Sequence, residues 1–86
     1  MNMSSLQQVF DTAIKNNSEY VAVKVSMSGF EGCEIIINPT NNFQAKLEYY
    51  KNAYNDNLTL KTFNGIKIID ATYGSMIDID NYFKER

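Results

Sequence analysis

The sequence contains no histidine and only one cysteine, Cys33. A single cysteine cannot form a disulfide within the chain, and without histidine the usual ligand sets of a zinc site are out of reach. A reactive thiol needs a neighbouring base or cation, and the most common such base is absent. We therefore expect Cys33 to be a buried or half-buried structural residue in a reducing, cytoplasmic environment.

Positive charge and long apolar runs are also scarce. Eight basic residues against ten acidic ones give a net charge of -2, which offers no electrostatic footprint for nucleic-acid phosphates. No stretch approaches the roughly 20 apolar residues that span a bilayer, and the N-terminal MNMSSLQQVF lacks the features of a signal peptide. We expect a soluble protein, and a membrane or nucleic-acid partner is disfavoured.

The sequence also has few of the residues that are typical of flexible segments. One proline and four glycines in 86 residues leave no room for a linker or a low-complexity tract. A chain of this length can bury one hydrophobic core. The sequence therefore predicts a single domain over residues 1–86.

Three segments have the spacing of amphipathic helices. In residues 6–15, apolar side chains recur at i, i+3, i+4, i+7 and i+8 after a capping-box pattern of Ser5 and Gln8. Residues 43–54 carry a second apolar stripe, and a third helix follows a Ser75 cap. The residues that we expect to face the core from the last two helices are Phe43, Leu47, Tyr50, Tyr54, Met76, Ile79, Tyr82 and Phe83.

Two hairpins are predicted between these helices. Residues 20–27 alternate, with valines on the core face, and residues 33–38 return as an antiparallel partner that ends at Pro39. Residues 58–73 form the second hairpin, with Asn64-Gly65 as a type I′ turn. This turn would pair Phe63 with Ile66. The face directed at the helices would then consist of Leu58, Leu60, Ile69, Ala71 and Tyr73.

The predicted order is α-β-β-α-β-β-α. It indicates an α+β fold, with a four-stranded, largely antiparallel sheet of two hairpins and the helices packed on one face. Such a sheet has two edges, and an edge or a bare sheet face is a natural site for a partner or a second copy.

No pattern of residues predicts catalysis, a metal or a cofactor. Asp70, Asp78 and Asp80 could be imagined as an acid–base or cation site, but their spacing lacks the glycine and distal glutamate of a calcium loop. Helix-start charge and surface solvation are the interpretation that we adopt for them. We therefore expect a protein that is not an enzyme.

Aromatic residues are the feature that favours binding. Six tyrosines and five phenylalanines are many for so short a chain. Tyr50 and Tyr54 follow the core stripe, whereas Tyr49 lies off it. Phe30, in the first hairpin loop, is either a contact or folds back over the sheet. The residues that we predict to bind a partner are Phe30, Glu31, Glu48, Tyr49, Lys51 and Asp56.

Residues 37–68, INPTNNFQAKLEYYKNAYNDNLTLKTFNGIKI, resemble small uncharacterised proteins of phages and prophages of low-GC Gram-positive bacteria. The match is carried by Asn38-Pro39, Asn42-Phe43, Lys46-Leu47, Tyr49-Tyr50, Ala53-Tyr54 and Leu60-Lys61-Thr62-Phe63. That family has no assigned activity, so the resemblance implies a biological context and no site. Small acidic phage proteins of this kind often inhibit host machinery, including CRISPR–Cas and other defence systems.

Three functional hypotheses follow. The first is a non-enzymatic phage or prophage accessory protein that binds a host protein in the cytoplasm, as an inhibitor of a defence system. The second is a structural or assembly component of the phage that self-associates through its sheet. The third is a binder of nucleotides or single-stranded nucleic acid, in which aromatic rings and lysines such as Lys24 and Lys61 would contact the bases and phosphates.

Overall fold

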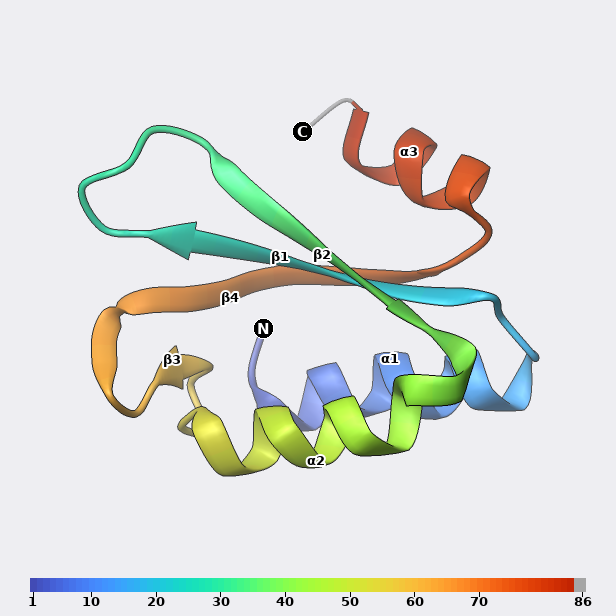
Figure 1. The fold of residues 1–86 in the computed structure, drawn as a ribbon, viewed down its shortest axis with the longest axis horizontal. Helices are drawn as coiled ribbons and strands as arrows, with labels where there is room; N and C mark the ends of the chain where they lie inside the picture. Colours follow the sequence, from blue (N-terminus) through green and yellow to red (C-terminus); the bar gives the residue numbers. More distant parts are fainter. Residues whose placement is uncertain (85–86) are drawn as a thin grey trace.

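A computed structural model of the protein describes residues 1–84. Its elements are α1 (Met3–Lys15), β1 (Tyr20–Met27), β2 (Cys33–Pro39), the 3-10 turn η1 (Thr40–Asn42), α2 (Phe43–Ala53), β3 (Thr59–Leu60), β4 (Phe63–Gly74) and α3 (Met76–Lys84). The strands form one antiparallel sheet in the order β2-β1-β4-β3 (Figure 1). The predicted α+β class, the element order and the four-stranded sheet are confirmed.

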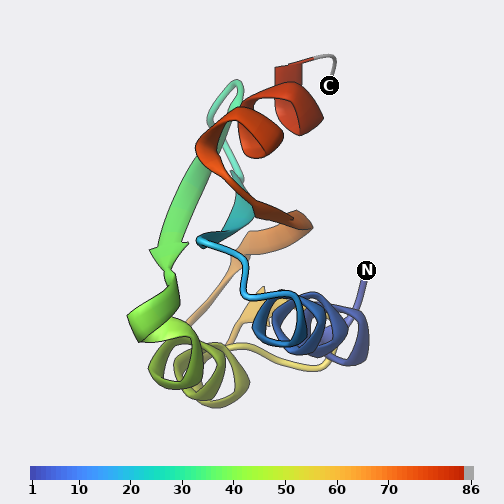
Figure 2. The same cartoon turned by 90° about the vertical axis from the view of Figure 1, so that its right-hand side faces the viewer.

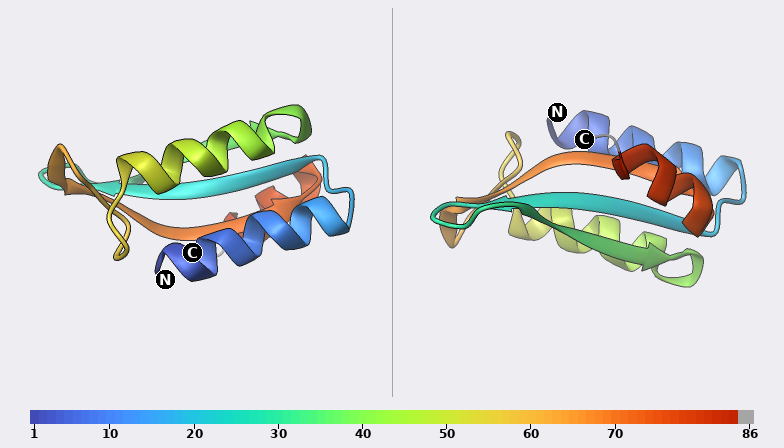
Figure 3. Two further views of the ribbon diagram at one scale, coloured as in Figure 1. Left: turned by 90° about the horizontal axis from the view of Figure 1, so that it is seen from below. Right: turned by 90° about the horizontal axis from the view of Figure 1, so that it is seen from above.

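The helices form two layers around the sheet. α1 and α2 cover one face, and α3 lies on the other (Figure 2). The expectation that the helices share one face therefore holds for α1 and α2 only. Those two helices occupy the valine face, so α3 packs on the opposite face, where its Phe83 ring lies 5.9 Å from the Lys24 ammonium. Seen from above, α3 lies over β1 and β4 and leaves β2 uncovered (Figure 3).

The main core lies between the sheet and the first two helices. Val21, Val23 and Val25 of β1 are buried there, as the alternation predicts. The ring of Phe10 on α1 meets the ring of Phe43 on α2 edge to face, with centroids 5.9 Å apart. The remaining buried members of the cluster are Leu6, Ala13, Leu47, Tyr50, Tyr54, Leu58, Ile68 and Ala71. The predicted core roles of Tyr50 and Tyr54 are thus confirmed.

The cap of α1 differs from the prediction. The helix begins at Met3, and Asn2 is its N-cap. The Ser5 N–H donates to Asn2 Oδ1 at 2.9 Å, and the Asn2 N–H donates to Ser5 Oγ at 2.8 Å. Ser5 is therefore the third residue of the helix and the reciprocal partner in the capping box, because the helix starts one turn earlier than the apolar spacing suggests.

The predicted type I′ turn is wrong. Leu60 pairs with Phe63, so the chain reverses at Lys61-Thr62, and Asn64-Gly65 lies inside β4. Neither Asn64 nor Gly65 has the positive φ that this turn requires. β4 pairs with β1 from Ile66 onward, and the Ser28 N–H donates to the Gly65 C=O at 2.7 Å. Long-range pairing with β1 therefore keeps this dipeptide extended, against its local preference.

A bulge changes which residues of β4 face the core. Lys24 pairs with Asp70, but Val25 pairs with Ile68, so β4 carries one extra residue at this point. Ile68 and Ala71 consequently both face the valine side, and Ile69 is 41% exposed. The prediction that Ile69 faces the helices is wrong, because uninterrupted alternation was assumed across the bulge.

Two polar side chains are buried in the core. Asn38 Nδ2 donates to the Val21 C=O at 3.2 Å, whereas Asn38 Oδ1 and the Tyr50 hydroxyl have no hydrogen-bond partner among residues 1–84. Burial raises the pKa of Tyr50 above 10.0. The neighbouring Asn38 side chain opposes part of this rise without reaching hydrogen-bond geometry. No helix within the described part of the chain is both long and apolar enough to cross a membrane.

Replacing the buried phenol tests this environment. Below about pH 10.0 the Tyr50 phenol is neutral in the folded and in the unfolded protein. As pH rises above 10.0, the unfolded chain loses the phenol proton first. The free energy of unfolding therefore falls as pH rises through the raised pKa of the folded state. We expect the Tyr50→Phe variant to have the wild-type free energy of unfolding at pH 7 and to lose less of it than the wild type above pH 10.0. Urea unfolding at both pH values measures this. The exposed Tyr49→Phe is the control, and an equal alkaline loss in both variants would contradict the expectation.

Gly74, at the junction of β4 and α3, allows a second test. Its φ is +135°, and a Cβ there would lie 2.7 Å from Asp78 Oδ2. We expect Gly74→Ala to lower the free energy of unfolding by about 1–3 kcal/mol, from backbone strain and loss of the α3 cap. Gly29 also has a positive φ, but a Cβ there would have open space around it. The smaller loss of stability that we expect for Gly29→Ala therefore measures the backbone strain alone. Equal losses in urea unfolding would show that the contact with Asp78 has no effect.

Candidate functional site

β2 is an edge strand that presents unpaired backbone groups. It lies at one end of the sheet, and the strand at the other end, β3, is only two residues long. The Thr40 N–H, just after β2, donates to the Glu19 C=O at 3.0 Å. The β1–β2 register continues from this pair without a bulge, and inward and outward residues alternate along antiparallel strands. The residues whose N–H and C=O point away from β1 are therefore Cys33, Ile35 and Ile37.

A second hydrogen bond supports this assignment. Ser28, just after β1, donates to the C=O of Gly65 in β4, so the even-numbered residues of β1 point toward β4 and the odd-numbered ones toward β2. Pro39 agrees with it as well, because it falls on the outward set and has no N–H to leave unpaired.

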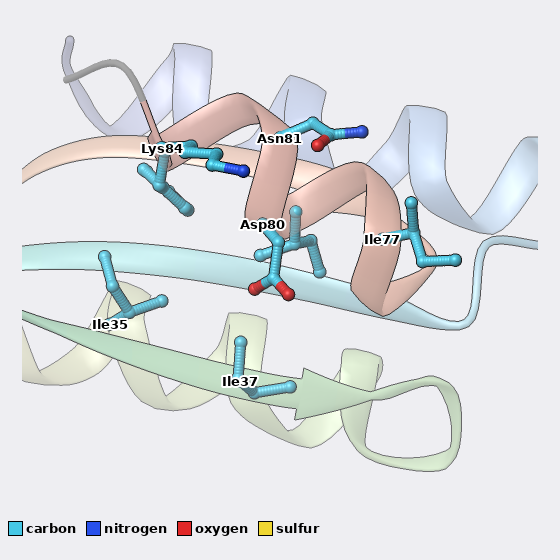
Figure 4. A pocket seen from close by; sticks show the side chains of 8 residues that line it. Ile35, Ile37, Ile77, Asp80, Asn81 and Lys84 are labelled. Carbon is cyan, nitrogen blue, oxygen red and sulfur yellow. The ribbon is translucent and has the colours of Figure 1, made fainter.

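An apolar groove of about 620 Å³ lies between β2 and α3. Ile35 and Ile37 point toward α3, and the Asp80 carboxylate lies over the gap between the two elements (Figure 4). Ile77, on the first turn of α3, is 72% exposed, and Ile35 is 37% exposed. We call this region the β2–α3 surface. Its lining residues are Ile35, Ile37, Ile77, Ile79, Asp80, Asn81, Phe83 and Lys84.

Polar contacts cap α3 at its start and join it to β4 near its end. At its start, the Ser75 N–H donates to Asp78 Oδ2 at 3.0 Å and the Asp78 N–H donates to Ser75 Oγ at 3.2 Å, which confirms the predicted cap. The hydrogen bond that the Ser75 backbone N–H donates to the carboxylate, and after it the Ser75 hydroxyl beside the carboxylate, lower the pKa of Asp78 below 3.8. Near its end, the Tyr82 hydroxyl donates to Asp70 Oδ1 at 2.9 Å. These contacts set the position of the α3 wall of the groove relative to β4.

The six predicted binding residues are all exposed but lie in two separate places (Figure 1). Phe30 and Glu31 are in the β1–β2 loop beside a second, smaller hollow of about 370 Å³. Phe30 is 70% exposed, so it does not fold back over the sheet. The others are on or after α2: Glu48, Tyr49, Lys51 and Asp56.

Tyr49 is the aromatic residue among the predicted binding residues on or after α2. Its side chain is 50% exposed. The Lys46 ammonium lies 5.2 Å from the ring centroid, and the Tyr50 ring meets it edge to face at 5.4 Å. These contacts hold the ring in place, so it could enter an interface without losing much conformational entropy.

The prediction for Cys33 is wrong. The residue is exposed, because it begins the edge strand just after the β1–β2 loop. The β2–α3 surface is the feature that the sequence reasoning missed. Its signal was present: three consecutive isoleucines follow Glu34 in a strand, and alternation must place at least one of them away from the main core.

The three carboxylates discussed above make separate contacts. Asp70 accepts a hydrogen bond from Tyr82, Asp78 caps α3, and Asp80 lies at the groove. Within residues 1–84, no group of three or more histidine, cysteine, aspartate or glutamate side chains could hold a metal ion. The chain matches no family model, no curated protein and no solved structure. Its function must therefore be argued from its surfaces.

Lowering the pH tests how α3 is held. Because the pKa of Asp78 is depressed in the fold, the cap stabilises fully above about pH 3.8, and this contribution is lost as pH falls through the folded pKa. We expect the protection factor of the Ser75 amide proton, its exchange rate relative to that of an unfolded chain at the same pH, to fall below that range, and Asp78→Ala to show the low protection factor already at pH 6. NMR hydrogen exchange measures this. Asp80→Ala should leave the Ser75 amide protected, and fast exchange in that variant would refute the assignment.

Proposed function

We propose that this protein acts by binding another protein and that the β2–α3 surface is its interface. The observation that carries the proposal is the combination of an unpaired strand edge with an apolar groove beside it. An added strand could hydrogen-bond to the outward groups of β2 and place alternate side chains in the groove. Large exposed apolar residues such as Ile77 are typical of interaction sites when they gather in one patch.

The lining of the groove favours a polypeptide over a small polar ligand. Isoleucine and phenylalanine side chains form most of it, and Asp80 and Lys84 place one negative and one positive charge at its rim. An apolar centre with a polar rim is the ordinary composition of a protein interface. The exposed strand edge adds directional hydrogen bonds that a compact solute would leave unused.

The resemblance to phage and prophage proteins makes a host defence protein in the bacterial cytoplasm the first external partner to test. In that hypothesis the protein is a stoichiometric inhibitor, and its exposed Tyr49 would supply a second, independent contact from α2. CRISPR–Cas effectors are the first targets that we propose to examine.

The experiment compares three variants in a low-GC Gram-positive host that carries a defence system. Tagged wild-type protein should block defence against a test phage and co-purify with one defence component. We expect Ile77→Lys and Tyr49→Ala each to reduce recovery of that component, because a charge in the groove and the loss of an anchoring ring both weaken binding. Ile14→Lys alters a residue of α1 that is 41% exposed and should bind like the wild type.

Two results would refute the inhibitor hypothesis. One is intact defence in cells that express the wild-type protein. The other is equal recovery of the component by wild type and by both variants, with circular dichroism showing that all are folded. If Tyr49→Ala alone loses the partner, the host-binding face is α2 and the β2–α3 surface has another occupant.

A further inference from the structure

We propose that a second copy of this chain pairs with β2, antiparallel and about a two-fold axis that passes through Ile35. The two sheets would join into one continuous sheet of eight strands. This proposal rests on the proposed function in one respect: both take the β2–α3 surface to be a protein interface. It names a second copy as the occupant of the β2 edge, so a host protein that binds by an added strand would compete with that copy for the same backbone groups.

The backbone selects this register. With Ile35 opposite Ile35 of the second copy, Cys33 lies opposite Ile37 of the second copy, and every outward N–H and C=O of these three residues finds a partner. A register centred on Ile36 would place Cys33 opposite Pro39, which has no N–H. A register centred on Glu34 would place two carboxylates directly opposite each other. The Ile35 register avoids both faults.

The side chains fit the same arrangement. A two-fold axis between antiparallel edge strands is perpendicular to the sheet, so both α3 helices would lie on the same face, on either side of the junction. The outward residues Ile35 and Ile37 of each copy then extend the apolar floor of the groove of the other. Glu34, the only charged residue of β2, would lie opposite Ile36 of the second copy, so the junction contains no pair of like charges.

The middle of β2, residues 35–38, lacks the features that keep edge strands apart. β2 has no lysine, its pairing with β1 has no bulge, and its proline lies at the last position. Natural proteins protect long edges with such residues, and an unprotected apolar edge pairs with another chain. The hydrogen-bonding groups are symmetric about Ile35, so a second copy satisfies them without any partner of different sequence.

Cysteine crosslinking tests the register. In a Cys33→Ser background, Ile35→Cys would place two thiols on the two-fold axis. Hydrogen-bonded antiparallel partners have Cα atoms about 5.5 Å apart, within the range of about 4.4–6.8 Å that a disulfide allows. We expect a covalent dimer under mild oxidation, while Ile14→Cys in the same background remains monomeric. Crosslinking of Ile35→Cys no faster than that of Ile14→Cys, or slower than that of Ile36→Cys, would overturn the proposal.

Light scattering tests the dimer without new cysteines. The wild-type protein should have twice its chain mass of 9.9 kDa, and Ile35→Lys should raise the dimer dissociation constant at least about 30-fold. Ile14→Lys should remain dimeric, and circular dichroism establishes that the lysine variants are folded. A wild-type protein that is monomeric at every concentration would refute self-pairing. Host binding that is lost in Ile77→Lys would still support the proposed function in that case.

Discussion

The burial of β1 is the constraint on which the rest of the fold depends. Val21, Val23 and Val25 face α1 and α2, while Ala22, on the opposite side of the strand, is equally inaccessible. A strand buried on both faces must be a central strand, because its backbone groups need partners on both edges. The pairing of β1 with β2 and β4 follows from this requirement, and so does the position of β2 at the edge of the sheet.

The same pairing explains where sequence reasoning succeeded and where it failed. Helix stripes and the alternation of β1 were readable because each residue's burial follows from a local period. The prediction at Asn64-Gly65 failed because a local turn preference of roughly a few tenths to one kcal/mol is smaller than the gain from the ladder that pairs residues 66–74 of β4 with β1. The bulge beside Asp70 could not be predicted, since it depends on how two distant strands fit together.

The position of α3 shows how the candidate site arises from the fold. Gly74, the Ser75–Asp78 cap and the hydrogen bond from Tyr82 to Asp70 direct this helix over β1 and β4. A helix over the centre of a sheet leaves the outermost strand uncovered. The groove is therefore a consequence of the docking of α3, and the sequence shows its two walls separately but not their proximity.

Exposed apolar residues at the groove are unfavourable for an isolated protein, and this favours the interpretation of the groove as an interface. An exposed isoleucine on α3, such as Ile77, gains nothing for folding, because a polar residue there would solvate the helix equally well. An edge strand of isoleucines adds the risk of uncontrolled pairing. A defined partner removes both costs at once by covering the apolar side chains and satisfying the outward backbone groups.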